Sequence, residues 1–202
     1  MARYSPAGYL IFQRGGTLLA FSPQTAIPNE SVLVLVDHAG HETELPVPAA
    51  SFHRPRFSPD GRRLAYSVGS GAASDDDIYL FDLADDRSQR LTFGQGHAAP
   101  IWSPDGKSLV FTQGRSGEIG MFTKRADGGT IAPLFASETA AEYAAAFSPD
   151  ERYAAYTTTE TGTDEVFVET YPPGRGKCPR RVVSRRSGRT MGVSCTSSLA
   201  MG

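Results

Sequence analysis

The first 174 residues of this sequence contain no cysteine, because Cys178 and Cys195 both fall near its C-terminal end. A disulfide framework and a thiolate metal site are therefore excluded from most of the chain. Apolar runs are short, and none approaches the roughly 20 residues that a helix needs to cross a bilayer. The run at residues 9–12 is also too short for a signal peptide, so we expect the chain as written to stay in the cytoplasm by default.

Sequence motifs for catalysis are missing as well. The sequence has no G-x-S-x-G nucleophile elbow, no phosphate-binding loop, no kinase catalytic loop and no H-E-x-x-H zinc motif. We therefore expect no enzyme activity, no cofactor and no metal ion in this chain. A kinase or peptidase domain, if the same protein has one, is expected outside these residues.

Acidic residues are absent from residues 175–202, which form a basic tail. The basic residues of this tail are Arg175, Lys177, Arg180, Arg181, Arg185, Arg186 and Arg189. The rest of the chain holds the remaining 13 of the 20 basic residues and all 22 acidic ones, a net charge of −9. An arginine-rich tail could bind nucleic acid or anionic lipid, but this one lacks interleaved aromatic residues, so we expect no nucleic-acid binding.

One phrase, in contrast, occurs three times. FSPDGRRLAY, WSPDGKSLVF and FSPDERYAAY begin 45 residues apart, which is typical of a structural unit and not of a catalytic motif. Pro presets φ, Asp bonds back to nearby backbone and Gly tolerates positive φ, so the phrase predicts a tight turn. The predicted turn residues are Phe57, Ser58, Pro59, Asp60, Gly61, Trp102, Ser103, Pro104, Asp105, Gly106, Phe147, Ser148, Pro149 and Asp150.

Each unit of 45 residues also contains four short stretches with strand character. In the first unit, residues 63–68, 77–83 and 88–93 have this character, and a fourth stretch ends at Trp102. Four short strands at this spacing are typical of a propeller blade, so the sequence predicts an all-β propeller of four-stranded antiparallel blades. The aromatic residues that open the three phrases are expected to end an inner strand and to pack between blades. Glu151 replaces the glycine of the other turns, and a positive φ there would cost about 1 kcal/mol.

The N-terminal part fits the repeat less closely. Residues 9–21 predict a hairpin around Gly15-Gly16, residues 31–47 predict another around Ala39-Gly40, and residues 52–57 supply an inner strand. The predicted blade units lie near residues 9–56, 57–101, 102–146 and 147–174, within a partial propeller at residues 1–174. A closed propeller usually has about four to eight blades, so these three to four blades predict an incomplete ring.

The segment RLTFGQGHAAPIWSPDGKSLVF, running on into EIGMF, resembles the TolB-like (WD-like) β-propeller repeat. The resemblance covers about residues 50–174 and implies a non-catalytic scaffold of about six to eight blades. It also implies that the protein binds other proteins or senses ligands, often in the periplasm or elsewhere outside the cytoplasm. GYLIFQRGGTLLAF and VLVLVDHAGHETELP are similar to a narrower group, the propellers of bacterial receptor-type serine/threonine kinases.

The sequence therefore predicts a binding scaffold, a fragment of a larger protein, with a protein partner. Two alternatives stay open: the gating propeller of a prolyl-oligopeptidase-type serine peptidase, and the non-functional product of a decayed gene. A downstream G-x-S-x-G domain would favour the peptidase, whereas an upstream kinase domain and membrane helix would favour a sensor. Because a partial ring leaves strand edges unpaired, we also expect low stability or self-association.

A shifted reading frame is a further hypothesis for the tail, which shows no strand alternation. The codons that encode residues 188–198 permit, one base out of frame, the phrase W-S/T-D-D-G-R-E-L-Y-F. Its Trp would fall 41 residues after Phe147, close to the interval of the other repeats. We therefore predict that residues 175–202 are either frame-shifted or disordered.

Two clusters of polar residues have the residue types of a metal site. His38 and His41 lie beside Asp37 and Glu42, but a polar hairpin turn explains this group better than a metal centre. The three residues at 75–77 are all Asp and could collect Ca²⁺. Their spacing does not match a calcium-binding loop, so a solvated acidic loop is the favoured interpretation.

His97 is the remaining candidate. It falls in the predicted loop GQGHAAP, which could face the central channel of the propeller. The alternative is a histidine that is hydrogen-bonded or exposed in an ordinary loop.

Overall fold

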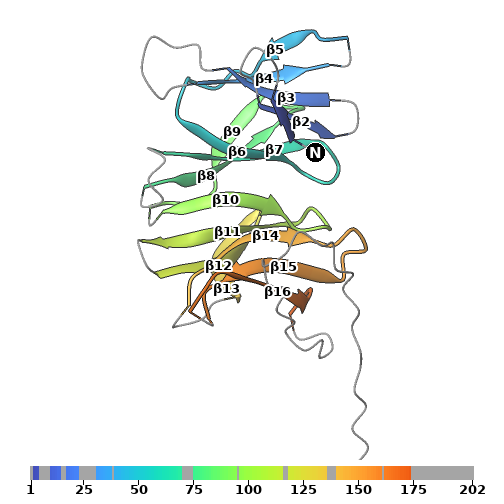
Figure 1. Cartoon of the computed structure of the whole chain (residues 1–202). Helices are drawn as coiled ribbons and strands as arrows, with labels where there is room; N and C mark the ends of the chain where they lie inside the picture. Colours follow the sequence, from blue (N-terminus) through green and yellow to red (C-terminus); the bar gives the residue numbers. More distant parts are fainter. Residues whose placement is uncertain are drawn as a thin grey trace, which may run out of the picture.

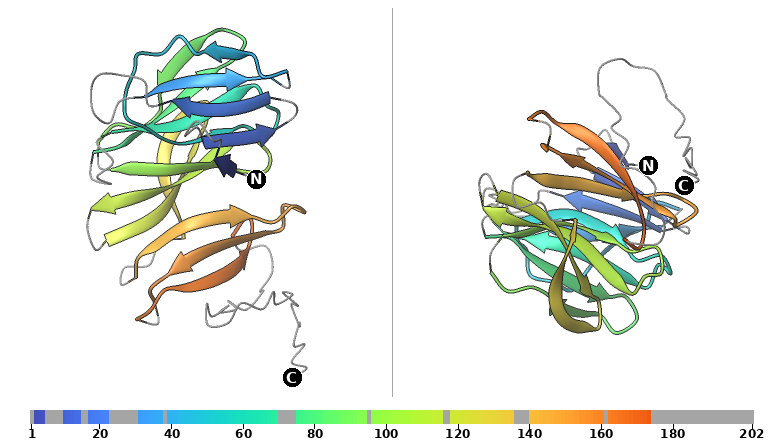
Figure 2. Two further views of the ribbon diagram at one scale, coloured as in Figure 1. Left: turned by 45° about the horizontal axis from the view of Figure 1, so that its top comes forward. Right: turned by 90° about the horizontal axis from the view of Figure 1, so that it is seen from below.

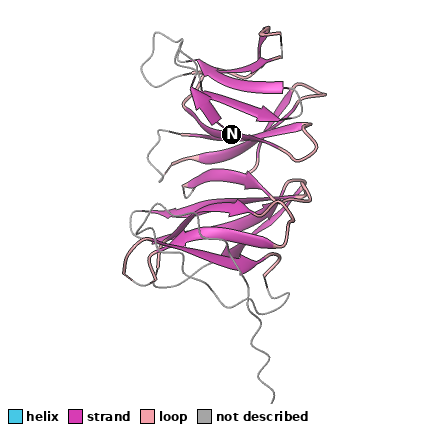
Figure 3. Ribbon diagram, turned by 45° about the vertical axis from the view of Figure 1, so that its right-hand side comes forward, coloured by secondary structure: helices cyan, strands magenta, loops and turns pink. Residues whose placement is uncertain are grey.

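The structure is a computed structural model of the whole chain. It describes residues 2–4, 10–14, 17–22, 31–37, 39–69, 75–94, 96–115, 118–135, 140–160 and 162–173. Every regular element in these ranges is a β-strand (Figure 3), so the predicted all-β class is confirmed. Within the same ranges, no helix is long and apolar enough to span a membrane.

Four antiparallel sheets contain the described strands, and within each sheet the strands follow chain order (Figure 1). The first sheet contains β1 (Ala2–Tyr4), β2 (Leu10–Arg14), β3 (Thr17–Ser22), β4 (Val32–Val36) and β5 (Glu42–Glu44). Arg14 pairs with Thr17 and Val36 pairs with Glu42, so both predicted N-terminal hairpins are present.

The next three sheets are built on the repeated phrase. The second contains β6 (Phe52–Phe57), β7 (Arg63–Val68), β8 (Asp77–Asp82) and β9 (Arg87–Arg90). The third contains β10 (His97–Trp102), β11 (Ser108–Arg115), β12 (Glu118–Arg125) and β13 (Gly128–Phe135). The fourth contains β14 (Glu142–Phe147), β15 (Tyr153–Thr158) and β16 (Glu165–Thr170). The four-stranded antiparallel blade is therefore confirmed in the second and third sheets.

Each sheet built on the repeated phrase begins one strand earlier than the predicted unit, which was counted from the turn. β6 pairs with β7, and β10 pairs with β11, although the sequence units divide each of these pairs. The physical reason is the turn itself, since a tight turn joins strands that are antiparallel neighbours in one sheet. The repeated phrase therefore lies inside each blade, between its first and second strands.

The same pattern of hydrogen bonds occurs in each of the three turns. In the third sheet, Ser103 Oγ donates to Asp105 Oδ1 at 2.6 Å and accepts from the Ser108 backbone N–H at 2.9 Å. Asp105 Oδ1 also accepts from the Lys107 N–H at 3.0 Å, and the Ser103 hydrogen bond is the main cause that lowers the Asp105 pKa. The Ser–Asp pair recurs in the other two turns at 2.5 and 2.6 Å. The serine of each phrase thus holds its turn together, a role that the Pro, Asp and Gly preferences alone do not predict.

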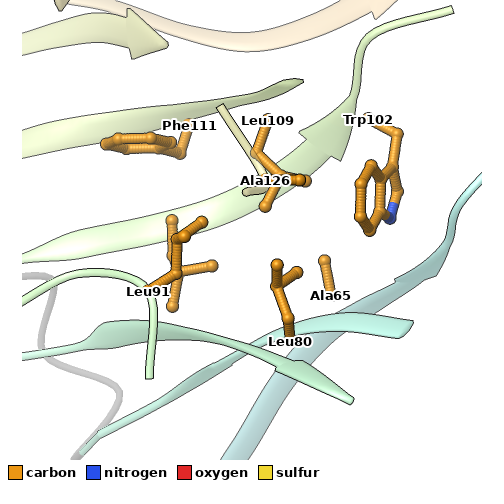
Figure 4. Close-up of a cluster of buried hydrophobic side chains, with 8 residues drawn as sticks. Ala65, Leu80, Leu91, Trp102, Leu109, Phe111 and Ala126 are labelled. Atoms are coloured by element: carbon orange, nitrogen blue, oxygen red, sulfur yellow. The ribbon is translucent and has the colours of Figure 1, made fainter. Parts of the chain in front are cut away.

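Figure 2 shows the sheets following one another around an arc that does not close into a ring. Neighbouring sheets pack face to face through apolar side chains that alternate along each strand. Between the second and third sheets, Ala65, Leu80 and Leu91 face Leu109 and Phe111 (Figure 4). The cores therefore lie between sheets, and the stability of each sheet depends on its neighbours.

The aromatic residue that opens each phrase ends the first strand of its sheet, as predicted. Trp102 is 7% exposed and packs against the second sheet, and its Nε1 donates a hydrogen bond to the Arg56 carbonyl oxygen at 3.0 Å. The Arg63 guanidinium lies 4.7 Å from the centre of the Trp102 ring. Trp102 therefore fixes the position of β6 relative to β10.

Candidate functional site

The first strands of the second, third and fourth sheets, which we call the inner strands, lie beside one another and share one irregularity. Each has a β-bulge, at which its register with the following strand shifts. Arg54, Ala99 and Ala144 lie in these bulges, with positive φ values of 49°, 56° and 56°. Bulges re-aim side chains and are common beside functional sites, so the inner strands are the place to look for binding.

A cavity of about 180 Å³ lies where the inner strands meet, and we call it the inner cavity. The second sheet contributes Arg54 and Arg56 to its lining. The third and fourth sheets contribute the rest: Ala99, Pro100, Ile101, Val110, Phe111, Thr112, Met121, Ala144 and Ala145. Because three sheets supply these residues, the inner cavity exists only in the folded arc.

The charge of the inner cavity is positive. Arg54 is exposed and Arg56 is half-buried, and none of the described residues that line the cavity is acidic. Burial, and then the charge of Arg54, lower the pKa of Arg56, although a guanidinium stays protonated at physiological pH. Arg56 Nη1 donates to the Pro55 carbonyl oxygen at 3.1 Å. The arrangement is suited to binding an anion with apolar surface nearby.

The inner cavity could not be recognised in the sequence, because its residues come from three repeats and share no residue type. One signal was present in the spacing. Arg54-Pro55 and Ala99-Pro100 stand 45 residues apart, each in the strand before the repeated turn. Applying the repeat interval to that strand, and not only to the turn, would have aligned the bulges.

His97 does not lie in a channel-facing loop. It is the first residue of β10, it is 2% exposed, and it lies outside the lining of the inner cavity. Its Nδ1 is 3.5 Å from Asp77 Oδ1, and its ring meets the edge of Phe111 with the ring centres 5.5 Å apart. Neither ring nitrogen makes a hydrogen bond of good geometry with a described residue. Burial lowers the His97 pKa by more than the nearby Asp77 and Gln113 raise it. The correction arises because β10 starts earlier than expected and its first residue packs between two sheets.

The residues at 75–77 are not one solvated acidic loop. Asp75 is exposed, but Asp76 and Asp77 are 3% and 5% exposed. Asp77 accepts hydrogen bonds from Thr92 Oγ1 at 3.0 Å and from the Gly94 N–H at 2.9 Å, and it also pairs with Arg90. Its carboxylate is buried because these donors replace water. No cluster of metal-ligand type occurs in the part of the chain that the structure describes.

The other histidine group is a polar turn, as the sequence favoured. His41 and Asp37 are exposed, and His41 Nδ1 lies 2.9 Å from Asp37 Oδ2. Asp37 also accepts from the Ala39 and His41 backbone N–H groups at 2.8 and 2.9 Å. The backbone and side-chain hydrogen bonds from His41 are the main causes that lower the pKa of Asp37. Glu42 is exposed at the start of β5. His38 and the basic tail lie outside the described residues, so the frameshift or disorder of residues 175–202 stays a prediction.

Comparison with known proteins agrees with this architecture. Residues 28–177 match the family described as the TolB beta propeller domain. No curated protein matches the chain. The narrower likeness to kinase-linked propellers stays a prediction.

Solved structures share the fold at low sequence identity. A putative TolB from Agrobacterium tumefaciens is 19% identical, with a TM-score of 0.61 over 90% of this chain and 78% of that one. TolB from Acinetobacter baumannii is 22% identical, with a TM-score of 0.62 over 79% of this chain. A prolyl endopeptidase is 16% identical, with a TM-score of 0.66 over 85% of this chain. The chain spans 40% of the Acinetobacter protein and 28% of the endopeptidase. With three quarters of the sequence matched by one family, repeated blades and an open arc, the chain belongs to the TolB β-propeller family.

Proposed function

We propose that the chain is a non-catalytic scaffold that binds a protein partner through the inner strands. The inner cavity supports this proposal, because three sheets converge there and leave a concave, charged opening. The repeated bulges add a second argument. They interrupt the strand pairing at the same place in three sheets, and each bulge costs hydrogen bonds between strands. Bulges of this kind re-aim side chains and are common beside functional sites, so they support binding at the inner strands.

Site-specific photo-crosslinking tests the proposal in the cells that make the protein. A photoreactive phenylalanine analogue at Ala144, which is exposed and lines the inner cavity, is expected to capture one discrete protein. The same analogue at Gln89, exposed on the outer strand β9, is the matched control and is expected to capture none. Equal capture from both positions, or none from Ala144 in a folded protein, would contradict binding through the inner strands.

The second candidate is the gating propeller of a prolyl-oligopeptidase-type serine peptidase. The likeness to the prolyl endopeptidase, with a TM-score of 0.66, favours it. Sequencing the genomic locus separates the candidates. A downstream domain with a G-x-S-x-G motif would support the peptidase, and an upstream kinase domain with a membrane helix would support a sensor scaffold. A decayed gene predicts that no protein accumulates, which immunoblotting of the same cells measures.

Self-association is a further part of the proposal. The fourth sheet has three strands in its described part, whereas the second and third sheets have four. The outer edge of β16 is therefore open to another strand in the described structure, and an open edge can pair with a second chain. We propose that two copies of the arc associate by this route, with a strand of one copy added to the fourth sheet of the other.

A further inference from the structure

We infer that the inner cavity binds a carboxylate, and that its ligand is the C-terminal end of a peptide with a small apolar last residue. The inference rests on the proposed function, since it names the part of a protein partner that would enter the site. It is carried by Arg54 and Arg56 on β6 and by the mostly apolar residues that make up the rest of the lining.

The two arginines are not required by the repeat. The equivalent residues 45 and 90 positions later are Ala99 and Ala144 for the first arginine, and Ile101 and Ala146 for the second. All three inner strands form the same bulge, so the bulge forms equally well with alanine. Arg54 lies near enough to Arg56 for its charge to lower the pKa of Arg56, and the other two sheets carry no charge at the equivalent positions. Two cations on one inner strand, where the other two inner strands have none, are expected at a site that binds an anion.

The chemistry of the lining favours a carboxylate. A guanidinium presents parallel N–H donors that match the two oxygens of a carboxylate, and two guanidinium groups can hold one monoanion. The rest of the lining is mostly apolar and includes Ile101, Val110 and Met121. The hydroxyl of Thr112 already donates to the Ala98 carbonyl oxygen at 3.0 Å. Beyond the arginines the site therefore offers few donors, which disfavours a strongly hydrated phosphate dianion.

The size of the inner cavity limits the ligand. Its volume of about 180 Å³ is below the range of about 300–1,000 Å³ that is typical of pockets for drug-sized molecules. One residue with its carboxylate fits such a volume, and a longer peptide does not. The chain end is therefore expected to enter the cavity, while the rest of the partner contacts the surface of the inner strands.

Heteronuclear NMR titration of the full chain tests the inference with three probes: N-acetyl-leucine, N-acetyl-leucinamide and inorganic phosphate. We expect the acid to shift the amide signals of Ala99, Ile101 and Ala145, with a Kd on the order of 1–10 mM for so small a ligand. The amide and phosphate are expected to bind at least about tenfold more weakly.

Variants assign the binding to the arginines. Arg54→Gln is expected to weaken binding of the acid by about tenfold or more, and Arg54→Lys by less, because lysine keeps the charge but loses the paired donors. Arg87→Gln is the matched control, since Arg87 is exposed on β9 and away from the inner cavity. Unchanged dispersion of the remaining amide signals shows that each variant is folded.

Three results would overturn the inference: equal binding of acid and amide, preferential binding of phosphate, or unchanged affinity in folded Arg54→Gln. The photo-crosslinking experiment fails independently. A partner captured at Ala144 without carboxylate binding would leave the scaffold proposal standing and remove the carboxylate. Carboxylate binding without a captured partner would leave the carboxylate site standing and remove the proposal that the inner strands bind a protein.

Discussion

Replacing His97 with phenylalanine is expected to stabilise the fold, because another sheet already uses phenylalanine at this position. Phe52 begins β6 as His97 begins β10, 45 residues later. The Phe52 ring meets the edge of Tyr66 at a centroid distance of 5.4 Å and an angle of 80°. The His97 ring meets Phe111 at 5.5 Å and 78°. The two environments have nearly the same geometry, but only the histidine buries polar atoms without hydrogen bonds among the described residues.

The magnitude follows from those polar atoms. A buried polar group without a hydrogen bond costs about 1–3 kcal/mol. Replacing His97 with phenylalanine removes this cost. Part of the gain is lost again, because fitting the larger ring into a dense core costs about 1 kcal/mol or more. We therefore expect His97→Phe to raise the free energy of unfolding by about 1 kcal/mol near neutral pH. Asp77 keeps its bonds from Thr92 and Gly94, so the substitution leaves no buried charge without a partner.

The pH dependence of stability gives a second measure of the same site. Burial lowers the pKa of His97 in the folded chain, while the unfolded chain titrates near the usual value of about 6.5. Below that pH the unfolded state binds more protons than the folded state, so the natural chain loses stability as pH falls. His97→Phe is expected to remove this loss.

Urea denaturation of both proteins, at about pH 7.5 and about pH 5.5, measures these effects. Phe52→His is the reciprocal control and is expected to lower stability by about 1–3 kcal/mol, because it buries the same polar atoms in the second sheet. The reasoning is refuted if His97→Phe destabilises the chain by more than about 1 kcal/mol, or if its pH dependence matches that of the natural protein.

Three further substitutions test the blades, each by urea denaturation. Glu151→Gly is expected to stabilise by about 1 kcal/mol, because Glu151 has a φ of 63° where the other two turns have glycine; no gain would show that the turn is unstrained. Ser103→Ala is expected to cost about 1–2 kcal/mol, since it removes the hydrogen bonds that the buried Ser103 hydroxyl makes with Asp105 and Ser108. This cost should shrink below about pH 4, as Asp105, whose pKa that bond lowers, becomes protonated. Leu109→Ala, at a side chain that is 0% exposed between two sheets, is expected to cost about 2–5 kcal/mol, and a smaller loss would contradict the packing of Figure 4.

The fold could be predicted because its turns use residues with special backbone chemistry. Pro59, Asp60 and Gly61 each favour one position of a tight turn, and their repetition at a fixed interval defines the blade. The four-stranded sheets followed from the strand character between the turns. The sheet boundaries were harder to locate. The interval between turns gives the length of the repeated unit, but it does not show which strand of the unit is the first of its sheet.

The candidate site could not be predicted in the same way. The bulges at Arg54 and Ala99 depend on how two strands pair, and arginine and alanine carry no shared preference for positive φ. The burial of His97 and Asp77 depends on contacts between sheets, which a local pattern does not contain. Short-range chemistry thus predicts the repeat, whereas the site arises from contacts between units 45 residues apart.

The open arc is the central structural claim, and sedimentation velocity over a series of protein concentrations tests it most directly. If open sheet edges drive two copies together, the sedimentation coefficient rises with concentration, and the melting temperature rises with it because association stabilises the folded state. A monomer at every concentration, with one cooperative melting transition that does not depend on concentration, would contradict self-association through an incomplete ring.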